Sequence, residues 1–543
     1  MPEEKEKYIV VLGSLLSGIG KGIVSSSICK MLSFYDIKIL PLKFDGYLNY
    51  DCGTMNPLKH GEVFVLDDKS EVDMDFGTYE RFMNADLNGS LSLTGGKLFS
   101  EIISRERKGD YLGEDIQIIP HLTGLIQNKV RAAYKENKLD VLLIEVGGTV
   151  GDIESGYFIE AMRELALKQD VVFVAVTYVP VIGVVGEQKT KPTQISMRSL
   201  MQLGVQPDFL VTRSEKDLQE NTRKKIALFA NLEPERVIDN HDLESVYLVP
   251  GALMEKGFDT ALVKALNLSK NTINEALLNR WKGCIPDENG KQKIKISVVG
   301  KYVKLHDSYA SVREALMHAA HVNGISVEIN WLESEELEGA DDAKVDQILR
   351  GSAGILVPGG FGNRGIDGML RAIRYAREKR IPYLGICLGM QLMAIEFARN
   401  VAGLHDAHST EFNPVTSNPV ISLMESQKGV ESKGGTMRLG SWPALLAEGS
   451  YARNTYGTDR ITERHRHRYE FNNAYREALS SKGLRIGGTT PDGALVEFIE
   501  WTDSFGIATQ AHPELKSRPE SPAPLFREFI AHAKNHGLKN PLA

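Results

Sequence analysis

The chain has 543 residues, more than one hydrophobic core normally organises, so two or more domains are expected. Hydrophobic residues make up 42% and charged residues 25%, as in ordinary soluble globular proteins. The formal net charge of -7 argues against binding to nucleic acid or to an acidic membrane surface. Four scattered cysteines without C-x-x-C spacing argue against a disulfide scaffold or structural zinc site, and they favour a reducing, cytoplasmic location.

The N-terminus and the longest uncharged run both argue against export or membrane insertion. The first residues, MPEEKEK, are acidic and unlike a secretory signal. The run VVFVAVTYVPVIGVVG, over 171–186, is short for a membrane span and contains Pro180. Its β-branched residues predict a buried strand followed by a loop.

Apolar strand-like segments alternate with helical stretches along both halves of the chain. In the first half they read YIVVLG, IKILPLKF, VLLIEVGG, VVFVAVTYV and DFLVTRSE. In the second half they read KIKISVVGKY, VEINWL, GILVPGG, IPYLGIC and LVEFIE. This alternation predicts α/β folds with doubly wound, mostly parallel sheets. A polar, turn-rich stretch between the halves predicts a domain over 1–268, a linker over 269–293 and a second domain over 294–543.

A glycine-rich loop, SGIGKGI over Ser17–Ile23, follows the first predicted strand and precedes a predicted helix. Backbone N–H groups in such a turn can cradle phosphate oxygens, and Lys21 would neutralise the β and γ phosphates. Leu15 replaces the first glycine of the usual pattern and Gly22 replaces its Ser/Thr, so a metal ion would rely on carboxylates elsewhere. The alternative is a tight β–α turn with an exposed lysine.

Two carboxylate groups are candidates for holding that metal. The stretch EVDMDFG places Asp73 and Asp75 on one face of a segment that we expect to be extended. Glu145 ends an apolar strand, and the carboxyl ends of parallel strands line the ligand crevice in such sheets. Mg²⁺ prefers oxygen ligands and needs only one or two carboxylates beside ATP phosphates. The alternative for each acidic residue is a solvated side chain or a helix cap.

Two polar stretches of the first half are open to two interpretations. KTKPTQ, over Lys189–Gln194, is dense in hydrogen-bond donors and suits a triphosphate and a base edge, or is an exposed polar loop. RERKGDYLGEDI, over Arg105–Ile116, has two glycines beside basic residues and suits a mobile lid, or is a solvated loop.

In the second half, Cys387 lies in LGICLGMQ, with Gly385 and Gly389 on either side. A strand leads in and a helix follows, the context of a nucleophile elbow in which a thiol is activated at a helix N-terminus. AHPE supplies His512 as the base and Glu514 to orient its ring. PGGFG, over Pro358–Gly362, offers backbone N–H groups for an oxyanion hole. The alternative is a cysteine that is only a small buried hydrophobe.

These motifs together resemble the CTP synthase family over essentially the whole chain. GICLGMQ, STEF and HPE resemble the class I glutamine amidotransferase domain, which implies a flavodoxin-like fold. The first half resembles the synthetase (amidoligase) domain, which implies a P-loop NTPase-like fold similar to dethiobiotin synthetase; its motifs are SGIGKGI, GEVFVLDD, YERF, ERKGDYLG, EVGGTVGDIES, GEQKTKPTQ and RKKIALF.

The resemblance implies a carbon–nitrogen ligase that catalyses the last step of de novo pyrimidine nucleotide synthesis. ATP phosphorylates O4 of UTP, and ammonia then displaces phosphate to give CTP. Cys387 attacks glutamine, His512 shuttles protons and Glu514 orients His512. The released ammonia passes through a tunnel to the other domain, and free ammonia is an alternative nitrogen source.

The resemblance also implies binding residues for each ligand. For ATP they are the loop and three residues near the adenine: Gly18, Ile19, Gly20, Lys21, Gly22, Ile23, His241, Asp242 and Leu243. For Mg²⁺ they are Asp75 and Glu145. For UTP they are Ser17, Lys189, Thr190, Lys191, Pro192, Thr193, Gln194 and Lys225. The inhibitor CTP shares the UTP positions and adds Asp152, Ile153 and Glu154. For glutamine they are Gly360, Leu388, Gly389, Met390, Gln391, Glu411 and Arg468.

Regulation and assembly follow from the same resemblance. GTP is implied as an allosteric activator of glutamine hydrolysis, with Arg364 as a contributor. A nucleotide site built across subunits implies a homotetramer, which in this family can stack into filaments. The sequence departs from the family in LGS for TGG before the loop, DGY for DPY at Gly46, and HDL for a KDV-like segment near the adenine. These departures affect nucleotide affinity and loop rigidity but remove no charged catalytic group.

Two other readings fit the sequence less well. Glutamine-dependent ligases that adenylate their substrate, such as GMP synthetase, need an SGGxDS loop, which is missing, and cobyrinate amidases generally lack the Cys-His-Glu triad together with KTKPTQ. A filament-forming or regulatory relic with dead sites is disfavoured because Lys21, Cys387 and His512 are intact.

Overall fold

The computed structural model describes residues 5–14, 16–182, 186–286, 290–424, 427, 429 and 434–539. Leu15, residues 183–185 of the long uncharged run and residues 287–289 of the predicted linker lie outside this part of the chain. The chain forms two compact units, one of residues 1–51 and 78–285 and the other of residues 52–77 and 286–543. None of the described helices combines the length and apolarity needed to cross a bilayer.

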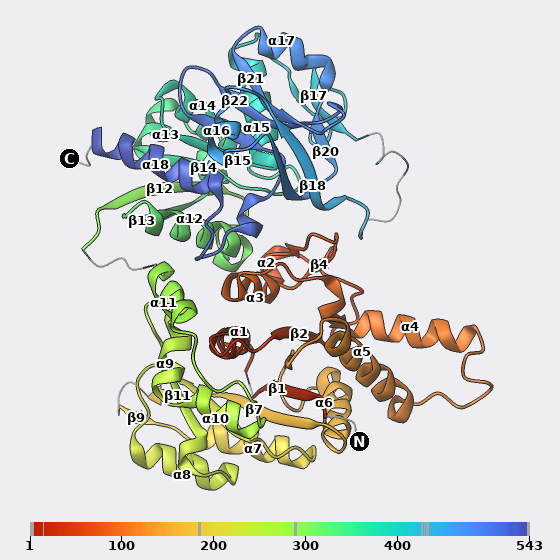
Figure 1. Ribbon diagram of the computed structural model, residues 1–543. Coiled ribbons are helices and arrows are strands. Elements are labelled where there is room, and N and C mark those ends of the chain that lie inside the picture. The colour runs from red at the N-terminus through yellow and green to blue at the C-terminus, as the bar shows by residue number, and fades with distance from the viewer. Residues whose placement is uncertain are drawn as a thin grey trace. The chain divides into compact units, whose positions relative to one another are not determined.

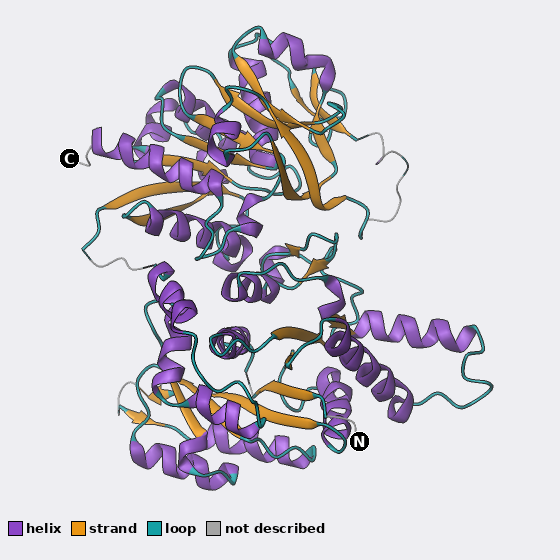
Figure 2. Ribbon diagram, viewed as in Figure 1, coloured by secondary structure: helices purple, strands orange, loops and turns teal. Residues whose placement is uncertain are grey.

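The first unit contains a seven-stranded sheet in the order β11-β10-β7-β1-β6-β2-β5, in which every neighbouring pair is parallel (Figures 1 and 2). Its strands are β1 (Lys7–Gly13), β2 (Ile39–Asp45), β5 (Ser92–Thr94), β6 (Val141–Val146), β7 (Asp170–Tyr178), β10 (Phe209–Ser214) and β11 (Val237–His241). A small hairpin pairs β8 (Val181–Ile182) with β9 (Glu187–Gln188). The five strands predicted from apolar runs are all present, which confirms the predicted mostly parallel sheet.

Helices cover both faces of this sheet, because successive residues of its central strands are buried on opposite sides. Ile9 and Val11 of β1 join the core with α1 (Lys21–Ser33), α9 (Val249–Glu255) and α10 (Phe258–Ala265). On the other side, Tyr8 packs against Tyr134 of α5, with ring centroids 5.4 Å apart. The remaining helices are α4 (Gly95–Arg107), α5 (Thr123–Glu136), α6 (Ile153–Ala166), α7 (Lys191–Gln202), α8 (Glu220–Ala230) and α11 (Glu275–Cys284), the last lying within the predicted linker.

The second unit contains a nine-stranded sheet in the order β13-β12-β14-β15-β23-β22-β21-β18-β19. It is parallel from β13 (Ser326–Glu333) through β12 (Lys293–Gly300), β14 (Gly354–Val357) and β15 (Tyr383–Ile386) to β23 (Gly506–Thr509). It continues antiparallel through β22 (Val496–Trp501), β21 (Leu484–Thr489) and β18 (Arg438–Leu446) to the edge strand β19 (Arg460–His467). A separate three-stranded sheet joins β16 (His408–Ser409), β17 (Pro419–Leu423) and β20 (Tyr469–Phe471).

Two apolar clusters cover the two faces of the nine-stranded sheet. One contains residues of α13 (Asp342–Leu349), α14 (Ile366–Glu378), α15 (Leu388–Asn400) and α17 (Arg476–Ser480). The other contains residues of α12 (Ala310–Val322), α16 (Tyr451–Tyr456) and α18 (Pro524–Lys539). Tyr383 and Leu384, neighbours on β15, belong to different clusters, as expected for a strand buried on both faces.

Residues 52–77 leave the first half of the chain and pack within the second unit. They carry α2 (Pro57–His60) and a hairpin of β3 (Phe64–Val65) and β4 (Glu71–Val72), coloured red-brown in Figure 1. The prediction that Asp73 and Asp75 share an extended segment is wrong, because Asp75 is the first residue of α3 (Asp75–Met83). Oδ1 of Asp73 accepts a hydrogen bond from N of Asp75 at 2.9 Å, so Asp73 acts as a helix cap.

Candidate active sites

Cys387 occupies the tight turn between β15 and α15. Its backbone angles, φ 52° and ψ -98°, are sparsely populated by residues with a side chain. Its backbone N–H donates to the carbonyl of Thr509 at 2.7 Å, which fixes the turn to β23. This is the strand–turn–helix geometry that the sequence predicted for a nucleophile.

The glycines that flank Cys387 are required by close packing rather than by positive φ angles. A Cβ on Gly389 would lie 2.1 Å from the carbonyl oxygen of Val357. A Cβ on Gly385 would lie 2.8 Å from Cβ of Ala508. The turn is therefore held on both sides by neighbouring strands, which fixes the position of the thiol.

His512 follows β23 and lies between Cys387 and Glu514. Its Nδ1 is 2.7 Å from Oε1 of Glu514, and its backbone N–H donates to the carbonyl of Arg464 at 2.7 Å. Burial alone lowers the pKa of His512, but the Glu514 carboxylate and the charge on Cys387 together raise it to about 10. This environment favours an imidazolium at His512, the charged base that accompanies a cysteine nucleophile.

A pocket of about 70 Å³ lies beside the side chains of Cys387 and His512. The loop Pro358–Phe361 lines it together with Cys387, His512 and Glu514. A Cβ on Gly359 would be 2.8 Å from Cε1 of His512 and 3.6 Å from Cβ of Cys387, so the loop lies directly against the pair. Residues 52–77 contribute three further lining residues: Pro57, Glu62 and Val63.

The residues predicted to contact glutamine are only partly gathered around this pocket. Gly360 lines it, with Leu388 close enough that a Cβ on Gly360 would be 3.4 Å from that side chain. Nε2 of Gln391 instead donates to the carbonyl of Tyr469 at 2.9 Å. Arg468 donates to Oε1 of Gln427 at 2.5 Å and is not among the residues that line the pocket. Among the other predicted contacts, Gly389 and Met390 are buried within α15.

Lys301, which belongs to none of the predicted sites, is buried at the carboxyl end of β12. Its Nζ donates to the carbonyls of Phe361 and Gly362, while N of Gly362 donates to Oε1 of Glu411 at 3.2 Å. Burial lowers the pKa of Lys301 to about 8, and burial raises the pKa of Glu411. The strand-end position was the available signal, since such positions line ligand crevices.

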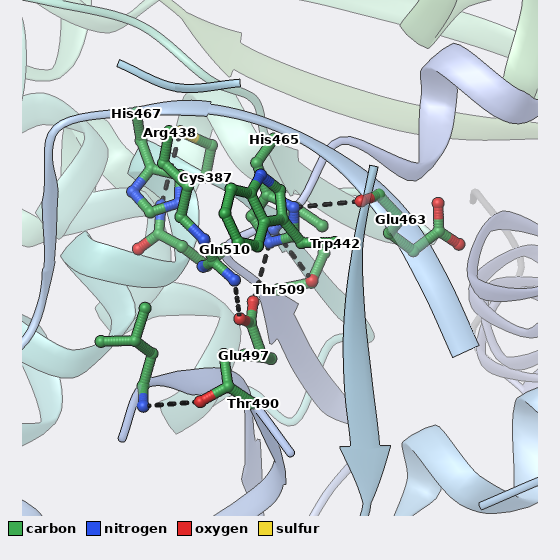
Figure 3. Close-up of polar contacts among 12 residues, drawn as sticks. Cys387, Arg438, Trp442, Glu463, His465, His467, Thr490, Glu497, Thr509 and Gln510 are labelled. Atoms are coloured by element: carbon green, nitrogen blue, oxygen red, sulfur yellow. Dashed lines mark hydrogen bonds and ion pairs between the residues drawn. The ribbon is translucent and has the colours of Figure 1, made fainter. Parts of the chain in front are cut away.

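A second buried cluster lies next to Cys387 (Figure 3). The Glu497 carboxylate accepts from Nη2 of Arg438 at 2.6 Å and lies 2.8 Å from Nε2 of His465. Burial opposes the charge of Glu497, but His465 and Arg438 outweigh it and lower the pKa of this carboxyl to about 2. Gln510, also not predicted, contacts Sγ of Cys387 through its Nε2 at 3.6 Å. The thiol therefore borders the pocket on one side and a buried polar cluster on the other.

In the first unit, the glycine-rich loop joins β1 to α1 as predicted. Gly18 and Gly20 have φ angles of 73° and 90°, which favour glycine. A Cβ on Gly18 would meet nothing within 4 Å, so the loop has open space beside it. Lys21 is the first residue of α1, and its Nζ donates to the carbonyl of Gly148. The other loop residues, Ser17, Ile19, Gly22 and Ile23, lie in the same turn and first helical turn.

Arg213 of β10 connects this loop to the predicted adenine segment. Its Nη1 donates to the carbonyl of Gly18 at 3.1 Å, and its Nε donates to Oδ1 of Asp242 at 2.9 Å. His241 ends β11, with its Nδ1 2.9 Å from Oδ1 of Asp217, and Leu243 packs at the edge of the unit's core. The structure thus brings the loop and the segment 241–243 together, through an arginine that belongs to none of the predicted sites.

Glu145 lies buried at the carboxyl end of β6. Its Oε2 accepts from the hydroxyl of Tyr79 at 2.6 Å, and Nζ of Lys43 lies 3.8 Å from its Oε1 and 3.9 Å from Oδ1 of Asp45. Oxygen donors at a strand end fit Mg²⁺, the hard cation implied by the resemblance. Asp75, the other predicted ligand, belongs to the second unit.

The stretch KTKPTQ begins α7 and is not an exposed loop. Thr190, Thr193 and Gln194 are buried, and Nε2 of Gln194 donates to Oγ1 of Thr190 at 2.9 Å. Pro192 lies in the first turn, where the missing N–H costs nothing. Outside the turn, Nζ of Lys189 pairs with Glu187, whose pKa is lowered first by that bond and further by Lys225. Lys191 is the first helical residue.

Residues 152–154 form the start of α6 after the strand end at Glu145. Oδ2 of Asp152 accepts from N and Oγ1 of Thr149, each at 2.8 Å. Ile153 is 91% exposed, which is unusual for an apolar residue. A Cβ on Gly46 would be 2.7 Å from the carbonyl oxygen of Glu154, so the glycine of the DGY sequence lets these two segments approach closely.

Comparisons with known protein families cover both halves of the chain. Residues 7–268 match the family described as "CTP synthase N-terminus". Residues 304–532 match the family described as "Glutamine amidotransferase class-I".

Individual relatives match over almost the full chain. The CTP synthase of Caldanaerobacter subterraneus subsp. tengcongensis is 50% identical over 98% of this chain and 99% of its own. The CTP synthase of Methanopyrus kandleri is 48% identical over 98% of this chain and 99% of its own. Among solved structures, the glutaminase domain of Trypanosoma brucei CTPS with bound acivicin is 39% identical, covering 45% of this chain and 94% of that one, with a TM-score of 0.43.

Proposed function

The chain belongs to the CTP synthase family, and from that premise we propose how its residues divide the reaction. The reaction is the ATP-dependent amination of UTP to CTP, with glutamine as the nitrogen donor. The second unit releases ammonia from glutamine, and the first unit activates UTP and accepts the ammonia. The observation that carries this division is the position of His512 between Cys387 and Glu514, with 2.7 Å between His512 Nδ1 and Glu514 Oε1.

Glutamine hydrolysis begins when the Cys387 thiolate attacks the carboxamide carbon. The His512 imidazolium gives its proton to the departing nitrogen, which leaves as ammonia and forms a glutamyl thioester. His512 then removes a proton from water, which attacks the thioester and regenerates the thiolate with glutamate as product. Glu514 stabilises the imidazolium and holds its ring, and backbone N–H groups of the Gly359–Gly360 loop face the developing oxyanion.

In the first unit, the residues that we assign to nucleotides are those that the sequence predicted. Lys21 and the backbone of 18–23 bind the ATP phosphates, 241–243 contact the adenine, and UTP is bound by Ser17, residues 189–194 and Lys225. CTP takes the same positions with 152–154. Glu145 and Asp75 hold Mg²⁺, which when bound neutralises phosphate oxygens. The buried carboxylate of Glu145 and the open space beside Gly18 support this assignment.

UTP activation requires a leaving group at C4, since a carbonyl oxygen leaves poorly. We propose that O4 receives the γ-phosphoryl group of ATP and that ammonia then displaces phosphate. Lys43 lies within 4 Å of two carboxylates at the strand ends and is placed to bind phosphate charge during this transfer.

Regulation by GTP is part of the same proposal. A pocket of about 480 Å³ next to the catalytic loop contains Leu58, Phe361 and Arg364, which offer apolar, aromatic and cationic contacts for a purine nucleotide. Nη2 of Arg364 donates to the carbonyl of Lys301, the residue that holds the loop 361–362. A bound anion at Arg364 would therefore act on the loop that lines the thiol pocket, and a GTP titration of glutamine hydrolysis tests this.

We also propose a cytoplasmic homotetramer that can form filaments, in which a neighbouring subunit covers part of the nucleotide site. The 91% exposure of Ile153, beside two residues assigned to CTP, supports a covering surface. Light scattering of the purified chain with and without UTP and ATP measures the assembly. A monomer under all conditions would contradict it.

One assay tests the whole function. The purified chain is incubated with UTP, ATP and Mg²⁺, and with either glutamine or NH4⁺, while CTP, ADP and glutamate are measured. We expect CTP from both nitrogen sources and one ADP per CTP. Formation of AMP and pyrophosphate, or amination of another acceptor, would favour a different glutamine-dependent ligase.

A further inference from the structure

The edge strand β19 ends in the alternating sequence RHRH, over Arg464–His467. Successive side chains of a strand point to opposite faces, so the two arginines share one face and the two histidines the other. β19 pairs with β18 along one edge, so its other edge is not used by the sheet. The strand therefore has two side-chain faces and one backbone edge that pairs with no other strand of the sheet. Each of the three makes a different set of contacts.

The histidine face is fixed in the interior. His465 lies 2.8 Å from Glu497 of β22, which also binds Arg438 of β18, and all three side chains are buried (Figure 3). Nδ1 of His467 lies 3.0 Å from the carbonyl of Tyr469. These contacts hold β19 against the sheet from one side.

The arginine face binds the segment 52–77. Nε of Arg464 donates to Oδ1 of Asp67 at 2.5 Å, and Nε of Arg466 donates to Oε1 of Glu71 at 2.8 Å. Nη2 of Arg466 also donates to the carbonyl of Gly53 at 3.0 Å. Glu71 is 3% exposed and the Arg464 side chain 0%, so each ion pair has one buried partner, whose charge is costly to leave without its counterion. The other partner of each pair is more accessible, with 34% of the Asp67 side chain exposed.

The backbone edge of β19 that faces away from β18 contacts the proposed catalytic residues. The carbonyl of Arg464 accepts from the backbone N–H of His512 at 2.7 Å. The carbonyl of Arg466 lies 3.9 Å from Sγ of Cys387. The two residues whose side chains bind the segment 52–77 thus support, through their main chain, the base and the nucleophile.

The segment itself links the two half-reactions. It contributes Pro57, Glu62 and Val63 to the pocket that contains Cys387. At Asp51 and Thr78 the chain continues into the first unit, which carries the nucleotide residues. A change in its position therefore changes the thiol pocket and acts on β19 at the same time.

We propose that Arg464 and Arg466 are positioning residues that make glutamine hydrolysis depend on the position of the segment 52–77. This inference rests on the proposed function. While the two ion pairs are intact, β19 holds His512 and Cys387 in their reacting geometry and the pocket retains the released ammonia. When the pairs are weakened, the base and nucleophile lose this support and ammonia escapes before it is used.

The test measures glutamine hydrolysed per CTP formed by the full chain. Glu71→Gln removes the charge that binds Arg466, and Asp67→Asn removes the charge that binds Arg464; neither residue belongs to the catalytic or ligand-binding residues. We expect the ratio to rise about threefold or more in each variant, as kcat for glutamine falls with little change in KM. CTP synthesis from NH4⁺ should be unchanged, which also reports that the chain is folded.

Two further variants sharpen the result. Arg374→Gln breaks an exposed ion pair with Glu378 on α14, 2.7 Å long, and is the matched control that should change nothing. Glu71→Gln combined with Arg466→Gln should raise the ratio by less than the product of the two single effects, because both variants remove the same ion pair and only Arg466→Gln also loses the hydrogen bond to Gly53.

Three outcomes separate this inference from the proposed function. If the unmodified chain makes no CTP from NH4⁺, the proposed function fails. If it does, but Glu71→Gln and Asp67→Asn keep the original ratio of glutamine to CTP, the positioning role is wrong. A parallel loss of ammonia-driven and glutamine-driven synthesis in both variants would show general destabilisation and would equally overturn it.

Discussion

The glycine-rich turn of the first unit and the cysteine turn of the second are built from the same parts but packed in opposite ways. Each joins a buried parallel strand to a helix and carries glycines on both sides of the functional residue. At Gly18 a side chain would find only open space, whereas at Gly389 it would collide with the carbonyl of Val357 at 2.1 Å. The first turn uses glycine for positive φ angles, and the second uses it for close packing.

Under the proposed function, this difference separates a turn that binds a ligand from a turn that holds the nucleophile. Backbone N–H groups can contact phosphates only if no side chain shields them, so the first turn is open. A nucleophile must stay at a fixed distance from its base, so the second turn is filled by its neighbours on β14 and β23.

Removing the Cys387 thiol should abolish glutamine-driven synthesis and leave ammonia-driven synthesis intact. In Cys387→Ala we expect glutamine-driven CTP synthesis to fall by more than about 10⁴-fold, because no other residue in the pocket replaces the thiolate. Ammonia-driven synthesis should survive, since it needs only the first unit. Both rates are measured on the same preparation. Equal loss of both would contradict the division of the reaction.

Removing the phosphate-binding charge should instead stop both reactions. In Lys21→Ala we expect synthesis from glutamine and from NH4⁺ each to fall by about 10²-fold or more, because transfer from ATP loses its cation. The assay is ADP release with UTP present, with thermal unfolding as the control for folding. Retained ammonia-driven synthesis would remove Lys21 from its assigned role.

Replacing Glu514, the partner of His512, should shift the pH dependence of glutamine hydrolysis. Glu514 is among the groups that raise the pKa of His512 to about 10, so Glu514→Gln should lower this pKa. The imidazolium donates a proton to the departing ammonia, so activity is lost as pH rises through its pKa. We expect the alkaline limb of glutamine hydrolysis to move to lower pH, with kcat reduced by about 10²-fold or more. An unchanged limb would show that Glu514 does not set the charge of His512.

Two alanine substitutions test the packing contrast directly. Gly389→Ala should lower the free energy of unfolding by about 1–3 kcal/mol and impair glutamine hydrolysis, because the elbow has no room for a methyl group. Gly18→Ala should cost about 1 kcal/mol through its positive φ angle, with the main effect on the KM for ATP. Thermal denaturation and the two nitrogen-source assays measure these effects. If both variants lost the same stability and the same activities, the two turns would not differ in packing as described.

Most of the fold followed from apolar runs in the sequence. Strands such as VLLIEV and YLGI are buried along their whole length, and continuous apolar patterning of this kind is a local signal. The elbow and the His512–Glu514 pair were also predictable, because each depends on neighbours in sequence. The start of a helix at Asp75 was not, because Asp73 is compatible with either an extended segment or a helix cap.

The parts that escaped prediction are those whose partners lie far along the chain. Arg464 and Asp67 are 397 residues apart, and Arg466 and Glu71 are 395 apart, so no local pattern connects them. Residues 52–77 group with the second unit through such distant contacts, and their elements are too short to show a periodic pattern in the sequence. Lys301 was overlooked for a different reason, since a lone lysine after a strand is usually exposed.

The twisted backbone at Cys387 has an evolutionary consequence. A non-glycine residue at φ 52° and ψ -98° raises the energy of the native state by about 1–3 kcal/mol, which glycine would largely avoid. Selection for heat resistance and selection for turnover therefore act against each other at this single position. A lineage that no longer relied on glutamine would be expected to drift toward glycine there and to gain robustness as it lost the reaction.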